Sequence, residues 1–224
     1  NWAMWLFLEL YEYSVRSGDN EMIEAFKPKI YKLIKYFDGF LNEDGLLEKL
    51  KSWVFIEWSK ANDFTQDVNY PTNMLFAGML EAAGKLYKDD NLIRRAEKIR
   101  KTVLEQSFDG TFFVDNAIRE NGILKQTGER TEICQYYTFF FKIATPSSHK
   151  ELWETLLYDF GPQRKQNNKY PEIYFANAFI GNYMRLELLH NYGYRKEVLE
   201  NIEGYFYDMA VKTGTLWEND SIIA

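Results

Sequence analysis

The sequence contains few residues that bind metals or form disulfides. It has one cysteine, Cys134, and two histidines, His149 and His190, among 224 residues. A single cysteine excludes a disulfide within the chain, and two distant histidines without a partner at ligand spacing argue against a structural zinc site. We therefore predict no metal and no cofactor, with Cys134 as a buried thiol and both histidines at turns or helix ends.

The chain also lacks an excess of positive charge and a long hydrophobic run. It carries 27 Lys and Arg against 33 Asp and Glu, a formal net charge of −6, and no basic stripe of the kind that binds a phosphate backbone. Its longest apolar stretches, Trp5–Leu10 and Tyr136–Phe141, are far shorter than the roughly 20 residues that cross a bilayer. These absences predict neither a nucleic-acid partner nor a membrane segment, and they leave the oligomeric state open.

The N-terminus has no targeting signal either. Asn1 is not a start methionine, and the residues after it already have the apolar period of a helix. With 46% hydrophobic and 17% aromatic residues, the chain has enough material for one substantial core. We expect residues 1–224 to form a single domain that belongs to a longer protein.

The hydrophobic pattern has the 3.6-residue period of amphipathic helices in eight segments. These segments pair through short polar turns rich in Gly, Asp, Asn and Ser, which stop one helix and cap the next. The pattern predicts four helical hairpins, built from Trp2–Ser17, Glu21–Leu41, Asn69–Tyr87, Leu92–Gln106, Glu132–Ile143, His149–Tyr158, Tyr174–Tyr192 and Lys196–Lys212.

The connections between hairpins are long, whereas those within hairpins are short. They cover Asn42–Asp67, Ser107–Arg130 and Asp159–Ile173. If consecutive helices are antiparallel neighbours, the long connections meet at one end of the molecule. Because long ordered loops in a compact domain are usually functional, we place the site at this end.

The fold class is therefore predicted to be all-α. Stacked antiparallel hairpins form either an open solenoid or a toroid, and the high aromatic content favours the (α/α)6 toroid, with an inner ring of bulky side chains. A complete toroid needs about two hairpins more than the four predicted here. Residues near Gly110–Asp115 have the composition of a small β-hairpin within a long loop, but no sheet core is expected.

Aromatic residues and carboxylates gather in the long connections, and this combination suits sugars. Flat rings stack on the C–H faces of a sugar, and hydrolysis of a glycosidic bond uses one carboxylic acid with one base or nucleophile. The candidates are Glu57, Trp58, Asp63, Asp67, Asp115, Glu129, Arg130, Glu132, Tyr170, Glu172, Trp217 and Glu218. Each also has a structural alternative as a cap or surface group, and Arg130 is expected to pair with Glu129 or Glu132.

Five short motifs follow one another along the chain. They are Val-Phe-Ile-Glu-Trp (54–58), Thr-Glu-Ile-Cys-Gln-Tyr-Tyr (131–137), Phe-Ile-Gly-Asn-Tyr-Met-Arg-Leu-Glu-Leu-Leu (179–189), Asn-Tyr-Gly-Tyr (191–194) and Thr-Gly-Thr-Leu-Trp-Glu (213–218). In this order they resemble glycoside hydrolase family 78, the α-L-rhamnosidases.

The resemblance implies an (α/α)6 domain that hydrolyses terminal α-L-rhamnosides with inversion. It implies Glu218 as the general base and Glu57-Trp58 as part of the sugar pocket, with glutamate where the family usually has aspartate. Trp58 and Trp217 would face the apolar side of the 6-deoxy sugar, and Tyr170 and Glu172 are further candidate contacts. The family's general acid precedes the helix that resembles Trp2–Ser17, so the chain is expected to be inactive alone.

Two other interpretations fit the same residues. One is another toroidal glycosidase with a different sugar specificity. The other is a helical module without catalytic activity, which binds a protein or a carbohydrate. An exposed apolar groove on the helices would favour the binding module, and a loop end lined by carboxylates would favour an enzyme.

Overall fold

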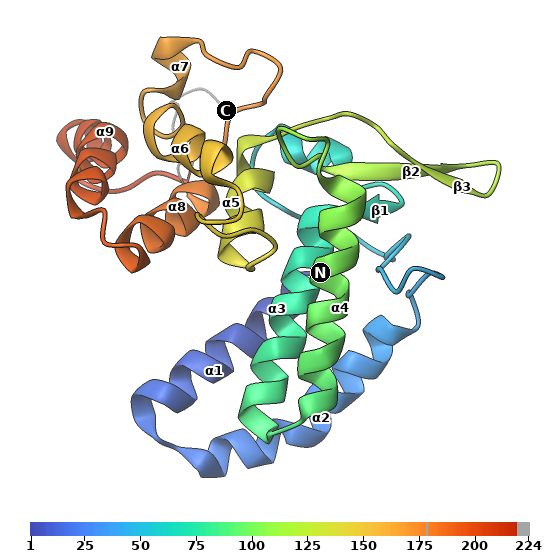
Figure 1. Cartoon of the computed structure of the whole chain (residues 1–224). Helices are drawn as coiled ribbons and strands as arrows, with labels where there is room; N and C mark the ends of the chain where they lie inside the picture. Colours follow the sequence, from blue (N-terminus) through green and yellow to red (C-terminus); the bar gives the residue numbers. More distant parts are fainter. Residues whose placement is uncertain (178, 219–224) are drawn as a thin grey trace.

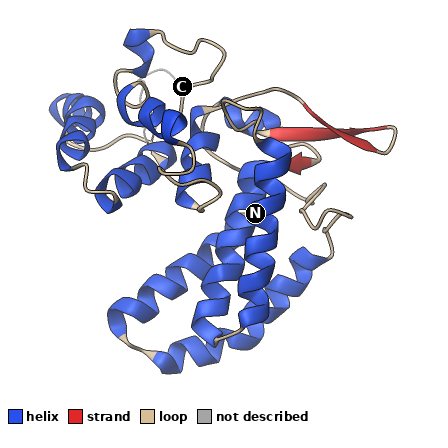
Figure 2. Cartoon of the chain, in the orientation of Figure 1, coloured by secondary structure: helices blue, strands red, loops and turns tan. Residues whose placement is uncertain are grey.

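The computed structural model describes residues 1–177 and 179–218, and most of these residues are helical (Figures 1 and 2). The eight predicted helices are present in the predicted order. Short turns join α1 to α2, α3 to α4 and α8 to α9, whereas the longer segment 141–149 separates α5 from α6. The longer helices are α1 (Trp5–Ser17, preceded by the 3-10 turn Trp2–Met4), α2 (Asn20–Asp38), α3 (Tyr70–Tyr87), α4 (Asp90–Ser107), α5 (Glu132–Phe140), α6 (Lys150–Tyr158), α8 (Ile180–Asn191) and α9 (Arg195–Thr213).

Aspartates start two of these helices through side-chain caps. Asp19 accepts a hydrogen bond from the backbone N–H of Met22 at the start of α2, and Asp89 accepts from Leu92 at the start of α4. Capping supplies acceptors to N–H groups that have no partner inside the helix. These two polar turns therefore cap the helix that follows them, as the sequence predicts.

Alternate helices form one continuous layer. Helix α3 contacts α1 on one side and α5 on the other, and α5 contacts α8. Helices α4 and α9 pack against α3 and α8 as second members of their hairpins (Figure 1). Almost every face of α3 is buried, and Gly78 lets α3 pack directly on the ring of Phe141. This curved double layer agrees with part of a toroid, whose closure stays a prediction.

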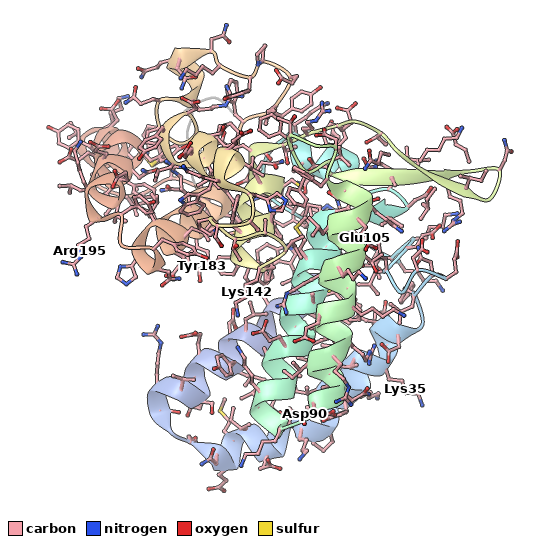
Figure 3. All side chains as sticks on the ribbon, in the orientation of Figure 1. Lys35, Asp90, Glu105, Lys142, Tyr183 and Arg195 are labelled. Carbon is pink, nitrogen blue, oxygen red and sulfur yellow. The ribbon has the colours of Figure 1, made fainter. Side chains whose placement is uncertain are left out.

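A cavity of about 990 Å³ lies between α1, α3, α5 and α8. Trp5 of α1, Phe140 of α5 and Tyr183 of α8 line it, together with Lys142 after α5. Figure 3 shows Lys142 and Tyr183 on the side of their elements that faces α1. The inner layer is therefore open between α1 and α8 in the part of the chain that the structure describes.

The second long connection forms a small sheet at the edge of the molecule (Figure 2). Strands β2 (Asn116–Glu120) and β3 (Ile123–Gln126) pair antiparallel, and β1 (Val68–Asn69) joins β2 on its other side. The prediction of a small β-hairpin in this long loop is confirmed, but the paired strands lie just after Gly110–Asp115, where an isolated antiparallel bridge joins Phe108 to Phe113. The turn is at Asn121-Gly122, where both φ angles are positive, and Asn-Gly is a strong sequence signal for such a turn.

Two further predictions about elements need correction. Helix α8 begins at Ile180 instead of Tyr174, because Tyr174 forms a parallel bridge with Thr131. The connections also contain two short helices absent from the prediction, the 3-10 helix η2 (Lys60–Phe64) and α7 (Arg164–Asn167).

The three long connections meet, as the sequence predicts. Arg119 of the second connection pairs with Glu48 of the first at 2.7 Å. Tyr174, after the third connection, donates its backbone N–H to the carbonyl oxygen of Arg130 at the end of the second, at 3.0 Å. Loops that are far apart in the sequence thus form one end of the molecule.

Candidate active site

Trp58 and Glu218 lie together at this loop end, although 160 residues separate them. The indole N–H of Trp58 donates a hydrogen bond to Oε1 of Glu218 at 2.6 Å. The side-chain amide of Asn177 donates to the backbone carbonyl of Glu218 at 2.9 Å. Trp58 is 47% exposed and Glu218 is exposed as well. A carboxylate and an aromatic ring therefore stand next to each other and in contact with solvent.

An aromatic pocket of about 480 Å³ adjoins Trp58. The ring centroid of Phe55 lies 4.8 Å from that of Trp58 and 4.9 Å from that of Trp53, and Trp2 lies 5.3 Å from Phe55. Trp53 is 66% exposed. Exposed aromatic rings clustered around a pocket of this size are typical of a ligand site. The aromatic pocket is lined by Asn1, Trp2, Ala3, Trp53, Phe55 and Trp58.

The loop that carries Trp58 is fixed through its backbone. Asn1 accepts from the N–H of Phe55 at 3.1 Å and donates to its carbonyl at 3.0 Å. Asn62 of η2 accepts from the N–H of Ile56 at 2.9 Å and donates to the carbonyl of Glu57. Ile56 is fully buried beneath the loop. These contacts hold the aromatic rings on a defined backbone.

Glu57 points into the protein, away from the aromatic pocket. Its side chain is 0% exposed, and Oε1 accepts the backbone N–H of Gly181 at 2.6 Å. Burial raises the pKa of Glu57 from 4.5 to about 8, and the nearby charge of Glu132 also raises it. The sequence placed Glu57 in the sugar pocket, but this buried position does not fit direct contact with a sugar.

Glu132 is a second buried carboxylate next to Glu57. Its Oε1 accepts from the hydroxyl of Tyr136 and from the backbone N–H of Gly161 at 3.0 Å, and its Oε2 accepts from the N–H of Ala176 at 3.3 Å. Burial raises its pKa as well. Since each oxygen is engaged with protein groups, Glu132 holds the segment before α8 in place.

Trp217, Tyr170 and Glu172 have other surroundings. The indole N–H of Trp217 donates to the hydroxyl of Thr213 at 2.7 Å, so this ring folds back onto the end of α9. Tyr170 packs edge-on against Phe112, with ring centroids 5.5 Å apart. Glu172 is exposed in a turn. Contact of these three residues with a substrate stays a prediction.

The remaining candidates take part in contacts within the protein. Asp115 is fully buried and accepts from the N–H and the hydroxyl of Thr131, both at 2.7 Å; burial raises its pKa to about 7. Arg130 pairs with Asp109 at 2.5 Å, so its expected ion pair exists but the predicted partners were wrong. The other pairs are Asp63 with Lys60 and Asp67 with the N–H of Arg119. The backbone carbonyl of Glu129 accepts the N–H of Asp115 at 2.9 Å.

The predictions for cysteine and histidine agree with the structure. Cys134 is buried and His149 precedes α6, while His190 lies in the last turn of α8. Within residues 1–177 and 179–218, no cluster of three or more His, Cys, Asp or Glu side chains has the arrangement of a metal site. In the same ranges, every helix is too short or too polar to cross a membrane.

Asn177 and Gly181 hold the site but were not among the predicted site residues. Both lie between residues 174 and 182, where Asn177, Gly181 and Asn182 interrupt an otherwise helical pattern. Gly and Asn have low helix propensity, so their grouping at the start of a predicted helix indicates a later helix start. That signal could have identified residues 174–177 as a loop next to the other long connections.

The fold is similar to parts of two solved rhamnosidase structures. A family 78 rhamnosidase of Bacillus sp. GL1 matches 94% of this chain with a TM-score of 0.78 and 16% sequence identity. The rhamnosidase from Klebsiella oxytoca, solved with rhamnose bound, matches 93% of the chain with a TM-score of 0.69 and 15% identity. This chain spans only 22% and 38% of the lengths of those proteins.

Comparisons of the sequence alone gave no such match. No protein-family model and no curated protein matches this chain. At 15% and 16% identity the structural likeness shows the fold and not the activity. The chain therefore has a helical fold similar to that of part of a glycoside hydrolase, in which Trp58 and Glu218 come together at the end formed by the long loops.

Proposed function

We propose that the chain is part of the catalytic domain of a glycoside hydrolase that removes terminal α-L-rhamnose with inversion. The hydrogen bond between Trp58 and Glu218 carries this proposal, because it puts a carboxylate beside an exposed ring at the predicted site. The fold shared with two rhamnosidases supports it. An apolar ring suits the methyl group and C–H face of a 6-deoxy sugar.

Glu218 is the proposed general base. Its carboxylate is exposed to solvent, so water can reach it, and the Trp58 N–H donates to Oε1 and holds the group in place. The base removes a proton from this water while it attacks the anomeric carbon, and a carboxylic acid protonates the leaving oxygen. Inversion requires the two carboxyl groups to be about 6.5 to 9.5 Å apart. We assign the acid to a part of the enzyme beyond this chain.

The test uses the full-length protein that contains this chain, with an aryl α-L-rhamnoside as substrate. We expect Glu218→Gln to lower kcat by about a hundredfold or more, since a general base contributes roughly 10²- to 10⁴-fold. NMR of the first product should show the β anomer of rhamnose. Glu200→Gln, an exposed glutamate of α9, is the matched control. Near-normal turnover by Glu218→Gln would falsify the assignment of the base.

The same assay separates the sugar specificities. Aryl glycosides of other sugars are compared with the rhamnoside at equal concentration. Faster hydrolysis of another glycoside would favour a different toroidal glycosidase, in which Glu218 still acts as the base. The absence of hydrolysis of every glycoside by the full-length protein would contradict both enzymatic interpretations.

The cavity between α1 and α8 favours a second candidate, a helical binding module. It has a volume of about 990 Å³, and Phe179 and Tyr183 at its edge are 56% and 51% exposed. Its lining combines aromatic rings with charged side chains such as Glu9, Arg16 and Glu187, and a groove on helices with both kinds of side chain can bind a partner. In a pull-down, Tyr183→Ser should then abolish capture of the partner while Glu218→Gln leaves it intact. The opposite dependence would support the enzymatic site.

A further inference from the structure

Two buried carboxylates hold the loop that precedes α8. Glu132 accepts the backbone N–H of Ala176 at 3.3 Å, and Glu57 accepts the backbone N–H of Gly181 at 2.6 Å. Both side chains are at most 1% exposed. Asn177 lies between these two anchor points, and its amide donates to the carbonyl of Glu218 at 2.9 Å. The backbone position of Glu218 therefore depends on this loop.

Glu57 replaces a local cap at the start of α8. Phe179, at the N-cap position, makes no side-chain capping bond, and the first N–H groups of a helix need acceptors from elsewhere. A carboxyl oxygen is a favourable partner there. Glu57 provides this acceptor although it is 124 residues away in the sequence.

Gly181 is the residue that allows this approach. A Cβ atom added to Gly181 would lie 2.6 Å from Oε1 of Glu57 and 2.8 Å from Cβ of Ala176. Neither neighbour has space to move freely, because both are buried. A side chain at position 181 must therefore displace the Glu57 carboxyl group or the loop.

Trp58 follows Glu57 directly in the sequence. The side chain of Asn62 bonds both the backbone N–H and the backbone carbonyl of Glu57. The N–H of Glu57 donates to Oδ1 of Asn62 at 3.4 Å, and the amide of Asn62 donates back to the carbonyl of Glu57. A shift of the Glu57 side chain therefore acts on the short backbone segment that sets the direction of the Trp58 ring.

We propose that Glu57 is a positioning residue: its carboxyl group joins α8 to the loop of Trp58, so that Trp58 and Asn177 together hold Glu218. The expected effect on activity rests on the proposed function, in which Glu218 is the general base. The structural link between Glu57 and Trp58 does not depend on it. It differs from the role that the sequence resemblance implies, in which residue 57 contacts the sugar.

Three variants of the full-length protein separate these roles. Glu57→Asp shortens the side chain, so it no longer reaches Gly181. Gly181→Ala leaves Glu57 unchanged but crowds its oxygen. Glu57→Gln keeps a carbonyl oxygen for the Gly181 N–H and removes the charge, and it resembles the protonated carboxyl that a raised pKa favours at neutral pH.

The measurement combines activity with a direct signal from Trp58. The protein is labelled with 5-fluorotryptophan, and the ¹⁹F resonance of Trp58 is assigned from its loss in Trp58→Phe. We expect Glu57→Asp and Gly181→Ala to shift this resonance and to lower kcat/KM by about tenfold or more. Glu57→Gln should keep the wild-type resonance and activity within about threefold. The controls are Glu105→Asp, exposed on α4, and Gly39→Ala, at an ordinary φ of −68°.

Two results would overturn the proposal. In the first, Gly181→Ala keeps wild-type resonance and activity while Glu57→Gln loses activity, which means that the charge of Glu57 acts on the substrate. In the second, neither Glu57→Asp nor Gly181→Ala moves the resonance. If Gly181→Ala loses its cooperative melting transition, the comparison of Glu57→Asp with Glu57→Gln decides. If the wild-type protein hydrolyses no rhamnoside, the proposed function fails, and the resonance alone still tests the positioning role.

Discussion

At the scale of single residues, neighbours in the sequence have opposite environments. Trp58 is 47% exposed and bonds Glu218, whereas Glu57 is fully buried and bonds Gly181. The pair Glu57-Trp58 looks like one functional unit in the sequence. In the folded chain the glutamate faces the interior and the tryptophan faces the solvent. Which of two adjacent side chains is exposed depends on contacts with distant segments, so the sequence could not assign it.

Trp53 gives a prediction at the same scale. Its ring forms an exposed wall of the aromatic pocket, 5.8 Å from the ring of Trp58. Because an aromatic contact contributes about 0.5 to 1.5 kcal/mol, Trp53→Ala should raise the KM of rhamnoside hydrolysis by about two- to tenfold. Its free energy of unfolding should change by less than about 1 kcal/mol, since the ring is 66% exposed.

Tyr207→Ala is the matched control, because Tyr207 of α9 is 65% exposed and lies outside the aromatic pocket. In urea unfolding, the free energy of unfolding of both variants should stay within about 1 kcal/mol of the wild type. An unchanged KM in Trp53→Ala, or an equal rise in both variants, would show that the aromatic pocket does not bind the substrate.

At the scale of elements, most helices could be predicted because their period is local. The predicted segment Asn69–Tyr87 differs from α3 by a single residue at its start. Helix α8 was predicted six residues too early, since residues 174–179 also carry apolar side chains. In the structure, the backbone N–H of Tyr174 bonds the carbonyl of Arg130 and that of Ala176 bonds Glu132, instead of helical carbonyls. This competition involves distant residues and leaves little trace in the hydrophobic pattern.

Arg185 of α8 joins three helices. Its Nε donates to Asn201 of α9 at 2.7 Å, and its Nη2 donates to the carbonyl of Leu157 in α6 at 3.0 Å, while Nη1 donates to Leu156. The side chain is 2% exposed. These bonds satisfy carbonyls at the end of α6 that have no partner within the helix. The planar guanidinium group is suited to several acceptors at once.

Replacing Arg185 by lysine should therefore destabilise this part of the molecule. An ammonium group cannot reach the three acceptors together, so buried carbonyls lose their partners. We expect Arg185→Lys to lower the free energy of unfolding by about 2 to 4 kcal/mol. Urea unfolding measures the change. Arg195→Lys, at an exposed position of α9, should have no effect; equal stability of both variants would mean that the three bonds contribute little.

At the scale of the whole molecule, the site depends on three segments that are far apart in the sequence. Trp58 lies in the first long connection, Asn177 before α8 and Glu218 after α9. The sequence indicated that the long connections share one end, because short and long turns alternate. The sequence could not show which loop residues are in contact, because the two partners of each contact are far apart in the sequence. The bond between Asn177 and Glu218, for example, joins residues 41 positions apart.

Buried and paired carboxyl groups also give the whole molecule a defined pH dependence. Burial raises the pKa of Glu57 to about 8 and that of Asp115 to about 7. Such groups are neutral in the folded state but ionise in the unfolded state above about pH 4 to 4.5. The folded state then binds more protons, so the stability that is fully present below this pH is lost as pH rises toward 8.

Glu81 has the opposite dependence. Burial alone would raise its pKa, but hydrogen bonds from Lys85 and Lys142 and the charge of Arg100 lower it to about 2. Glu81 thus contributes stability above its ordinary pKa of 4.5, and this contribution is lost as pH falls toward 2. Glu57 and Asp115 therefore lower the stability as pH rises above about 5, whereas Glu81 lowers it as pH falls below about 4.5.

We therefore expect the free energy of unfolding to be highest near pH 5 and lower at both pH 3 and pH 8. Each shifted group changes the slope by at most about 1.4 kcal/mol per pH unit. Urea unfolding at fixed ionic strength measures the profile. Glu57→Gln should flatten the side between pH 5 and 8, because it removes the group that titrates there, and Glu81→Gln should flatten the side below pH 4.5. A stability that rises from pH 5 to pH 8 in the wild type would show that Glu57 and Asp115 ionise freely in the folded protein, and would remove the basis for Glu57→Gln as a mimic of its protonated form.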